Sequence, residues 1–411
     1  MLFLLALCLF AAQAGAGDHL SHGAKARELM TRGEYELALD ELKTGLSLFP
    51  YDQALRQNLA SAHARTAQRY LELSRYDQAA EHFALARELA PGAGELGFMR
   101  GVALYLGKNY DAARAELLAA GDRAEPLAYL GRISYDQGDL AGAVTLWQRA
   151  LELNPELKGI TGLIEKAERE LPVESKMDKG YSSMFDLSFD AELPPGLSAD
   201  VLDALESAYN SVGADLGHFP TARIPVLLYT KSDYGSVTAG PDWSGGLYDG
   251  KIRLPVGGVT RVTPLMRAII FHEFTHVLIA ELGHGNVPTW LNEGLAEIQG
   301  RREFTPAVRG SNPAVGGRLL PLSTLSGAFT AMGGDEAALA YRQSHSMAQF
   351  MVSRYGWYAM REILRHLGER ATIESAVAQA LSDWSLDLDA VMREWRESLP
   401  AETDASVHPD W

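Results

Sequence analysis

Four short segments in the first 170 residues are similar to one another, and they constrain the fold of this part of the chain more than any other feature. Each consists of a turn, then an aromatic residue or leucine, then a small alanine, and they begin at Gly33, Arg75, Gly107 and Gly138. Helical sequence flanks each segment, and each unit closes with a proline, at Pro50, Pro91, Pro126 and Pro155. The spacing of these prolines scatters about the roughly 34 residues of a helix-pair repeat. Because a small alanine lets two helices approach and proline ends a helix, the pattern predicts a stack of helix pairs.

The pattern of residues 24–160 resembles the tetratricopeptide repeat (TPR). That resemblance implies an all-α superhelix with a concave groove, which acts as a platform for a protein or peptide partner. The alternative is that the repeats only support the domain that follows.

The first seventeen residues, Met1–Gly17, have the pattern of a signal peptide. An apolar run covers Leu2–Ala12, and small residues follow at the alternating spacing that a signal peptidase requires. The run is too short to remain as a transmembrane helix. We therefore expect a secreted or periplasmic protein without a permanent membrane span, and the alternative is a buried N-terminal helix.

Composition restricts both the partner and the type of metal site. The net charge of −16 disfavours binding to a phosphate backbone, so no nucleic-acid partner is expected. The single cysteine excludes an internal disulfide framework and any multi-cysteine zinc site. Histidines and carboxylates must therefore hold any metal.

The helical pattern is expected to stop near Pro172, which separates two domains. We predict a repeat domain over 18–170, a linker over 171–184, a second domain over 185–398 and a polar tail over 399–411. The second domain is predicted to be α+β, because strand-like segments at 185–190 and 224–229 flank a helical segment at 199–216.

A hairpin is predicted over 245–255. Asp249-Gly250 is the sequence signal of a type I′ turn. Gly246, Tyr248 and Pro255 suit the edge of a sheet, where a substrate chain could add as an extra strand, and we expect its main chain to lie near Lys251–Leu254.

The apolar helical segment around residue 272 contains the pattern H-E-x-x-H. His272 and His276 lie one helical turn apart on one face, so that two imidazoles can share one Zn²⁺ ion. Glu273 can reach a water at such a metal without binding the ion, as a general base must.

A third ligand is expected from the next helix. Glu293 follows His276 by 17 positions, and a helix–loop–helix return of that length can bring its carboxylate to the same ion. Two histidines and one glutamate leave a fourth position open for water. Glu297 lies one turn further, and we expect it to accept a hydrogen bond from His272. A solvated Glu297, or Glu297 as the ligand with Glu293 in support, is the alternative.

These two motifs resemble the gluzincin metallopeptidases, and in particular the bacterial peptidase MA-like domains, over residues 185–398. The resemblance implies a thermolysin-like zincin fold. It also implies that His272, His276 and Glu293 are the zinc ligands and that Glu273 is the catalytic base.

Gluzincins stabilise the oxyanion of the tetrahedral intermediate with a downstream tyrosine or histidine. Tyr341 and His345 lie one turn apart in the matching stretch, and we favour Tyr341. The sequence thus predicts a multidomain zinc metallopeptidase with a repeat platform for its substrate or a partner protein. The alternative is a protein-interaction scaffold whose zincin domain is inactive or structural.

Overall fold

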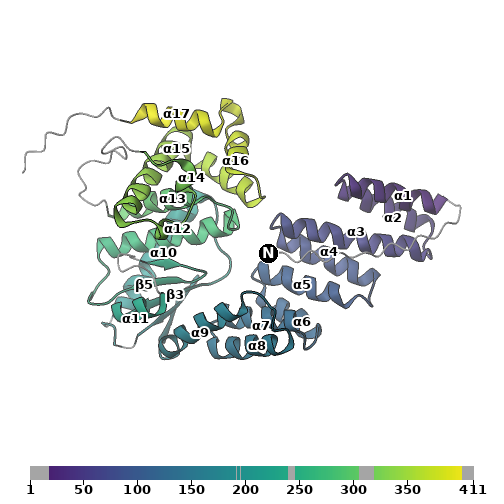
Figure 1. The fold of residues 1–411 in the computed structure, drawn as a ribbon, viewed down its shortest axis with the longest axis horizontal. Coiled ribbons are helices and arrows are strands. Elements are labelled where there is room, and N and C mark those ends of the chain that lie inside the picture. The colour runs from purple at the N-terminus through teal and green to yellow at the C-terminus, as the bar shows by residue number, and fades with distance from the viewer. Residues whose placement is uncertain (1–17, 191, 195, 239–245, 305–318, 400–411) are drawn as a thin grey trace, which may run out of the picture. The chain divides into compact units, whose positions relative to one another are not determined.

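The computed structural model describes residues 18–190, 192–194, 196–238, 246–304 and 319–399 of the 411 (Figure 1). The predicted signal peptide, 1–17, and the predicted tail after residue 399 lie outside the described residues. The chain divides after Glu168 into two units, which are described one at a time.

The first unit is a series of helix pairs followed by the start of a ninth helix (Figure 1). The helices are α1 (Asp18–Thr31), α2 (Tyr35–Leu48), α3 (Gln53–Glu72), α4 (Tyr76–Leu89), α5 (Gly94–Leu106), α6 (Tyr110–Ala119), α7 (Ala124–Asp136), α8 (Leu140–Leu153) and α9 (Ile160–Glu174). The predicted all-α repeat architecture is confirmed.

Each of the four predicted segments is the tight turn between the two helices of a pair. Gly33 and Gly138 take φ angles of +79° and +83°, in the left-handed region that glycine reaches without steric cost. The small residue that follows each turn is fully buried, with 0% exposure at Ala38, Ala79, Ala113 and Ala143. These alanines therefore allow the paired helices to pack closely.

Two prolines do not end helices as the sequence predicts. Pro126 lies in the first turn of α7, where the amide hydrogen that proline lacks has no helical acceptor. Pro172 lies inside α9, which continues to Glu174. In both cases only a terminal turn contains the proline, so few backbone hydrogen bonds are lost.

The second unit is a mixed sheet surrounded by helices. Its strands are β1 (Asp178–Tyr181), β2 (Phe185–Phe189), β3 (Ile224–Tyr229), β4 (Leu247–Tyr248) and β5 (Ile252–Pro255). Its helices are α10 (Leu197–Leu216), α11 (Lys231–Thr238), α12 (Pro264–Gly283), α13 (Thr289–Glu303), α14 (Leu322–Leu325), η1 (Phe329–Ala331), α15 (Gly334–Gly368), α16 (Ile373–Ala380), η2 (Ser382–Trp384) and α17 (Leu388–Ser398). The predicted α+β architecture is confirmed.

The described strands form one sheet in the order β1-β2-β3-β5-β4. Strands β2, β3 and β5 are parallel, and β1 and β4 flank them antiparallel. Helices α10 and α12 cover one face, where Leu187, Val226 and Leu254 join the main core (Figure 1). Helix α11 packs on the other face, where Tyr229 and Tyr234 form a smaller cluster with Val173 of α9.

Three local expectations about this sheet differ from the structure. Strand β1 lies within residues 171–184, the predicted linker, and pairs with β2. The β4–β5 hairpin has a three-residue connection, in which Gly250 has a φ of +103° and Asp249 has no positive φ, so the turn is not type I′. Strand β5 lies between β3 and β4, so the strand at Lys251–Leu254 is internal to the sheet. Among the described strands, β4 with Tyr248 forms this edge.

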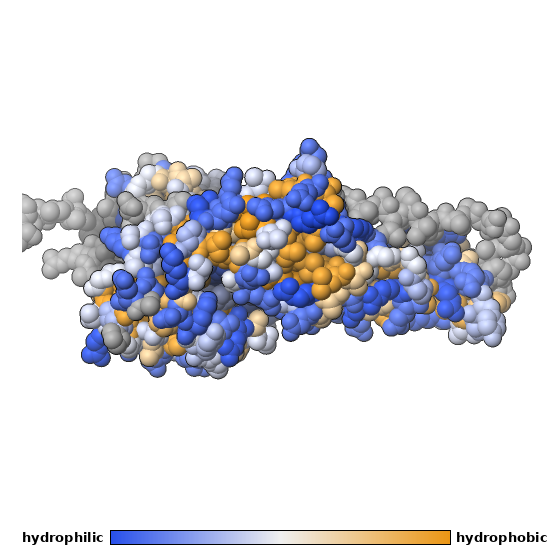
Figure 2. Space-filling model, turned by 90° about the horizontal axis from the view of Figure 1, so that it is seen from below, coloured by the Kyte–Doolittle hydropathy of each residue, from blue (hydrophilic) through white to orange (hydrophobic). Residues whose placement is uncertain are grey.

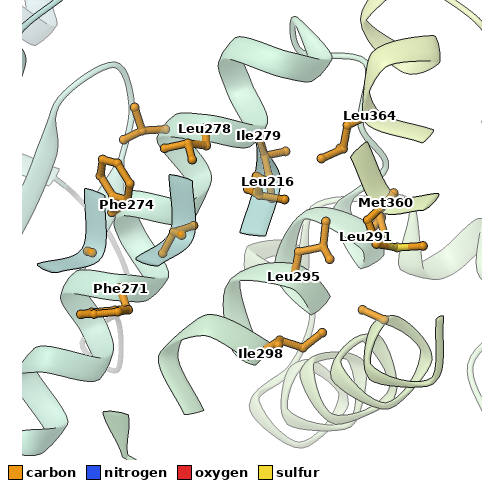
Figure 3. Packing of buried hydrophobic residues seen from close by; sticks show 14 of the residues in the cluster. Leu216, Phe271, Phe274, Leu278, Ile279, Leu291, Leu295, Ile298, Met360 and Leu364 are labelled. Atoms are coloured by element: carbon orange, nitrogen blue, oxygen red, sulfur yellow. The ribbon is translucent and has the colours of Figure 1, made fainter. Parts of the chain in front are cut away.

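Helix α13 packs between α12 and α15 through two glycines. A β-carbon on Gly300 would lie 3.0 Å from the carbonyl oxygen of Ala268 in α12, and one on Gly294 would lie 2.5 Å from that of Ser344 in α15. Around these contacts the three helices interlock through large apolar side chains, including Phe271, Leu291 and Leu295 (Figure 3). The glycines therefore set the distance between the helices.

The substitution Gly294→Ala is expected to lower the free energy of unfolding by about 1–3 kcal/mol, because the added methyl group overpacks the contact with α15. The matched control is Gly235→Ala in α11, where a β-carbon meets nothing within 4 Å. There alanine is expected to add about 0.5–1 kcal/mol through its helix propensity. Urea unfolding of the full chain measures both changes, and equal effects at the two positions would contradict the close-packing argument.

Candidate metal centre

Helix α12 is held at both ends, and this sets the direction of its site residues. Pro264 occupies its first turn, and the Oγ1 atom of Thr263 accepts a hydrogen bond of 3.1 Å from the amide of Met266. His284 ends the helix in the left-handed conformation, with a φ of +47°. Because an apolar core surrounds the helix, His272, Glu273 and His276 lie in a largely buried environment.

The structure brings the three predicted ligands together. Single ligand atoms of His272, His276 and Glu293 all lie within 4.8 Å of one another. The Oε2 atom of Glu293 lies 3.5 Å from Nε2 of His272 and 3.7 Å from Nε2 of His276. The prediction that α13 returns toward α12 and brings Glu293 to the histidine pair agrees with this geometry.

These three residues fit a tetrahedral metal ion. Ligand atoms about 2.1 Å from such an ion lie about 3.4 Å from one another, which is close to the two separations between Glu293 and the histidines. The Oε2 atom of Glu293 is buried and has no hydrogen-bond partner among the described residues. A buried carboxylate oxygen without a donor is costly, and a cation at this position would satisfy it.

The other ring nitrogen of each histidine faces an acceptor. Asn292 Oδ1 lies 3.0 Å from Nδ1 of His276. Glu297 Oε1 lies 3.7 Å from Nδ1 of His272, which is too far for the predicted hydrogen bond, and the same carboxylate accepts a 2.9 Å hydrogen bond from Arg301. A histidine that donates through Nδ1 presents a lone pair on Nε2, which is the form that binds a metal.

A pocket of about 630 Å³ opens beside these residues. Glu273 lines it while remaining 6% exposed. The backbone of Gly246 passes so close to this carboxylate that a β-carbon there would lie 2.7 Å from its Cγ. The remaining wall comes from α11, β4, the chain after α12 and the start of α15, with lining residues that include Tyr234, Thr238, Leu247, Tyr248, Val287, Thr330 and Tyr341.

The charged groups of the centre shift one another's pKa values. Burial lowers the pKa of His272, but its pairing with Glu293 and the nearby carboxylates outweigh burial and raise that pKa to about 9. Burial raises the pKa of Glu273, although both histidines oppose the shift. For Glu293 the histidines outweigh burial and the pKa is lowered. Two carboxylates on neighbouring helices thus differ in basicity, as a ligand and a proton-transfer group require.

Of the two oxyanion candidates, the structure places Tyr341 at the pocket. The ring of Tyr341 packs edge-to-face on Phe329 at a centroid distance of 5.2 Å, and burial raises the pKa of its hydroxyl, which keeps the proton it would donate. His345 is not among the lining residues. Burial lowers the pKa of His345 to about 4, with a further contribution from the charge of Arg301.

Residues 206–401, which contain α12, α13 and α15, match the family model of the Peptidase MA superfamily. Residues 124–157, which contain α7 and α8, match the tetratricopeptide repeat model. A comparison with curated proteins found no match. Among the helices that the structure describes, none combines the length and the apolar character needed to cross a bilayer.

Two parts of the candidate metal centre were not predicted from the sequence. Asn292 directly precedes Glu293, and its side-chain oxygen faces Nδ1 of His276. The sequence analysis assigns a hydrogen-bond acceptor to His272 only. The rule that each ligand histidine needs such an acceptor could have identified Asn292. Tyr234 and Thr238 of α11 also line the pocket. Nothing in their sequence indicates this, because the packing of α11 on the sheet brings them there.

The substitution Asn292→Ala is expected to weaken metal binding by the second unit about 10–100-fold, because Nδ1 of His276 loses its acceptor. Competition with a chromogenic zinc chelator measures the affinity. The control is Asn210→Ala, on the exposed side of α10. Equal affinity in the two variants would show that Asn292 does not support the ligand.

Proposed function

We propose that this protein is a zinc-dependent peptidase. The observation that carries the proposal is the joint position of His272, His276 and Glu293, whose ligand atoms lie within 4.8 Å of one another. Glu273 lies beside them in the same pocket, as a separate carboxylate that does not take part in the ligand set. The Peptidase MA match of residues 206–401 supports peptide bonds as the substrate class.

The chain's own residues supply proton transfer and orientation. Glu273 is buried and its pKa is raised, so it accepts a proton from the attacking water and later donates it to the leaving amine. Tyr341 lines the same pocket and donates its hydroxyl proton in a hydrogen bond to the oxyanion that develops. A bound Zn²⁺ ion would supply Lewis-acid polarisation of the water and of the scissile carbonyl.

The edge strand β4 offers a place for the substrate main chain. Its residues Leu247 and Tyr248 line the pocket, and β4 pairs with β5 on one side. An extended peptide can add to a sheet edge through main-chain hydrogen bonds. We propose that the substrate lies along β4, next to Glu273.

The repeat unit is proposed to bind a substrate protein or a partner protein. Several of its leucines are exposed, at 40% to 62%: Leu37, Leu48, Leu106, Leu118 and Leu153. Figure 2 also shows apolar residues gathered on one face of the molecule among hydrophilic ones. Exposed large apolar side chains are typical of surfaces that bind other proteins, and the exposed leucines of the repeat unit support this proposal.

We propose that the protein is exported from the cytoplasm, on the basis of the signal-peptide pattern in Met1–Gly17. N-terminal sequencing of protein recovered from the periplasm or culture medium tests this. A cleaved start near residue 18 supports export, and intact protein retained in the cytoplasm contradicts it.

A second candidate function, a protein-interaction scaffold with an inactive zincin domain, is favoured by the repeat match at 124–157. Its expected behaviour differs from that of a peptidase. The scaffold would bind a partner protein but would cleave no peptide in the presence of zinc.

The substitution Glu273→Gln is expected to reduce cleavage of a casein-derived peptide library by at least about a hundredfold while zinc content is retained, because the amide cannot accept the proton. A chelator is expected to abolish cleavage by the unsubstituted chain, and added zinc to restore it. The matched control is Glu281→Gln, a carboxylate on the same helix that pairs with His218 instead of lining the pocket. An unsubstituted, zinc-loaded chain that cleaves nothing would favour the scaffold.

A further inference from the structure

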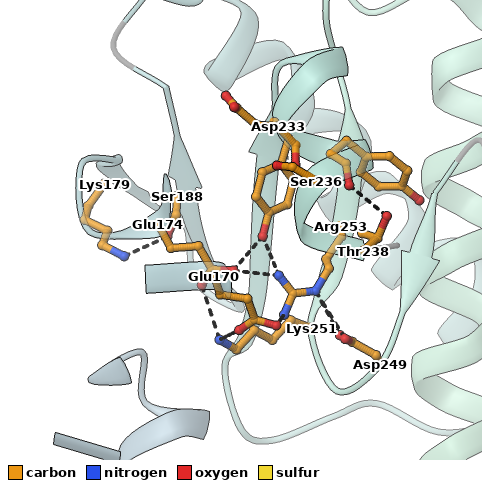
Figure 4. Close-up of polar contacts among 12 residues, drawn as sticks. Glu170, Glu174, Lys179, Ser188, Asp233, Ser236, Thr238, Asp249, Lys251 and Arg253 are labelled. Atoms are coloured by element: carbon orange, nitrogen blue, oxygen red, sulfur yellow. Dashed lines mark hydrogen bonds and ion pairs between the residues drawn. The ribbon is translucent and has the colours of Figure 1, made fainter. Parts of the chain in front are cut away.

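A buried network of charges lies on the face of the sheet away from the main core (Figure 4). Arg253 of β5 is at its centre, and its side chain is 1% exposed. We call the network the Arg253 cluster, and its members are Glu170 and Glu174 of α9, Tyr229 of β3, Asp249 and Lys251 of the hairpin connection, and Arg253.

The three nitrogens of the Arg253 guanidinium have separate acceptors. Nη2 donates to Glu170 at 2.9 Å, Nη1 donates to Glu174 at 2.6 Å, and Nε donates to Asp249 at 3.1 Å. Nη1 also donates to the hydroxyl of Tyr229, which in turn donates to Glu174 at 2.6 Å. Lys251 lies 3.4 Å from Glu174 and 3.9 Å from Glu170.

Such a cluster fixes the arrangement of the groups around it more than it adds to the free energy of unfolding. Taking charges out of water is expensive, and a buried ion pair often gives no net stabilisation over a well-packed apolar pair. A planar guanidinium with several directed acceptors nevertheless permits only one arrangement of its neighbours. The pKa of Glu174 is lowered because Lys251 and Arg253 outweigh the effect of burial, which keeps this carboxylate charged.

The neighbours that the cluster holds form one wall of the pocket beside Glu273. Asp249 belongs to the connection between β4 and β5, so its bond to Arg253 fixes this connection against β5, and Arg253 in turn joins the hairpin to Glu170 and Glu174 of α9. Strand β4 has only two residues and could not keep its position by pairing alone. On the other side, Tyr229 packs edge-to-face on Tyr234 of α11 at a centroid distance of 6.2 Å.

Both supported elements contact the site directly. Leu247 and Tyr248 of β4 line the pocket, as does Tyr234 of α11. We propose that Arg253 is a positioning residue for substrate binding, which acts through Asp249 and Tyr229 to hold the pocket wall formed by β4 and α11. This inference rests on the proposed peptidase function, and it assigns the Arg253 cluster to substrate affinity rather than to proton transfer.

The variant Asp249→Ala tests the proposal while preserving the fold. Without Asp249, the cluster contains two cations, Arg253 and Lys251, and two carboxylates, Glu170 and Glu174, so no buried charge is left in excess. The matched control is Asp186→Ala on β2 of the same sheet. Asp186 pairs with Arg223 at 2.8 Å in an exposed ion pair.

Three readouts are measured on the full zinc-loaded chain: peptide cleavage kinetics, hydrogen exchange and the thermal midpoint. The kinetics use a quenched fluorescent peptide chosen from the casein library. Asp249→Ala is expected to raise KM about fivefold with kcat within about twofold, because binding is lost and the chemical step is not. Hydrogen exchange at the amides of Leu247 and Tyr248 is expected to accelerate about tenfold. The thermal midpoint should match that of Asp186→Ala, and Asp249→Asn, which keeps one acceptor, should lie between Asp249→Ala and the unsubstituted chain.

An unchanged KM in Asp249→Ala would overturn the proposal, and so would unchanged exchange in β4. A fall in kcat at constant KM would also overturn it, since that result would assign the cluster to the chemical step. Failure of the peptidase function itself appears differently, as absence of cleavage by the unsubstituted chain. In that case the exchange rates of β4 alone decide whether the cluster holds the pocket wall.

Discussion

The close approach of α12, α13 and α15 is the constraint on which the second unit depends. Every residue assigned to metal binding or proton transfer lies on one of these helices, and small side chains at their crossings set the distances between them. A shift of one ångström between α12 and α13 would move Glu293 relative to the histidines by a similar amount. Metal coordination tolerates deviations of only about 0.2 Å in the ligand distances. The packing of these helices therefore sets whether the three ligands can hold an ion.

Electrostatics adds a second requirement to that packing. The centre buries two histidines and two carboxylates, and without mutual pairing each charge would be costly. Asn292 reduces this cost at His276 and orients its imidazole ring, and the carboxylate of Glu297 lies 3.7 Å from Nδ1 of His272. On the other face of the sheet, carboxylates from α9 pair with the buried Arg253 and offset the cost of its charge in the same way. In the metal centre and around Arg253, the charged groups are therefore stabilised by contacts with one another rather than by water.

Local periodicity allowed much of this architecture to be predicted from the sequence. The turn segments of the repeats, the strands at 185 and 224 and the ligand spacing on α12 are all short-range patterns, and the structure contains them. Features that depend on distant contacts were missed. A two-residue strand such as β4 carries no alternation that could identify it, and the partners of Arg253 lie about 80 residues earlier in the chain, where their charges are typical of an exposed helix face. The helix ends predicted at Pro126 and Pro172 were wrong, because a terminal helical turn tolerates proline.

Helix α9 has a consequence for the modularity of the protein. It begins at Ile160, within the repeat unit, and it ends at Glu174, whose carboxylate belongs to the second unit's buried network. The family match begins only at residue 206, after α9, β1 and β2. A fragment that begins at residue 206 would lose Glu170 and Glu174, the two carboxylates that pair with Arg253 and Lys251, together with β2, which pairs with β3. Residues 169–205 therefore belong with the sheet, and an exchange of repeat units between proteins would have to leave the end of α9 attached to the second unit.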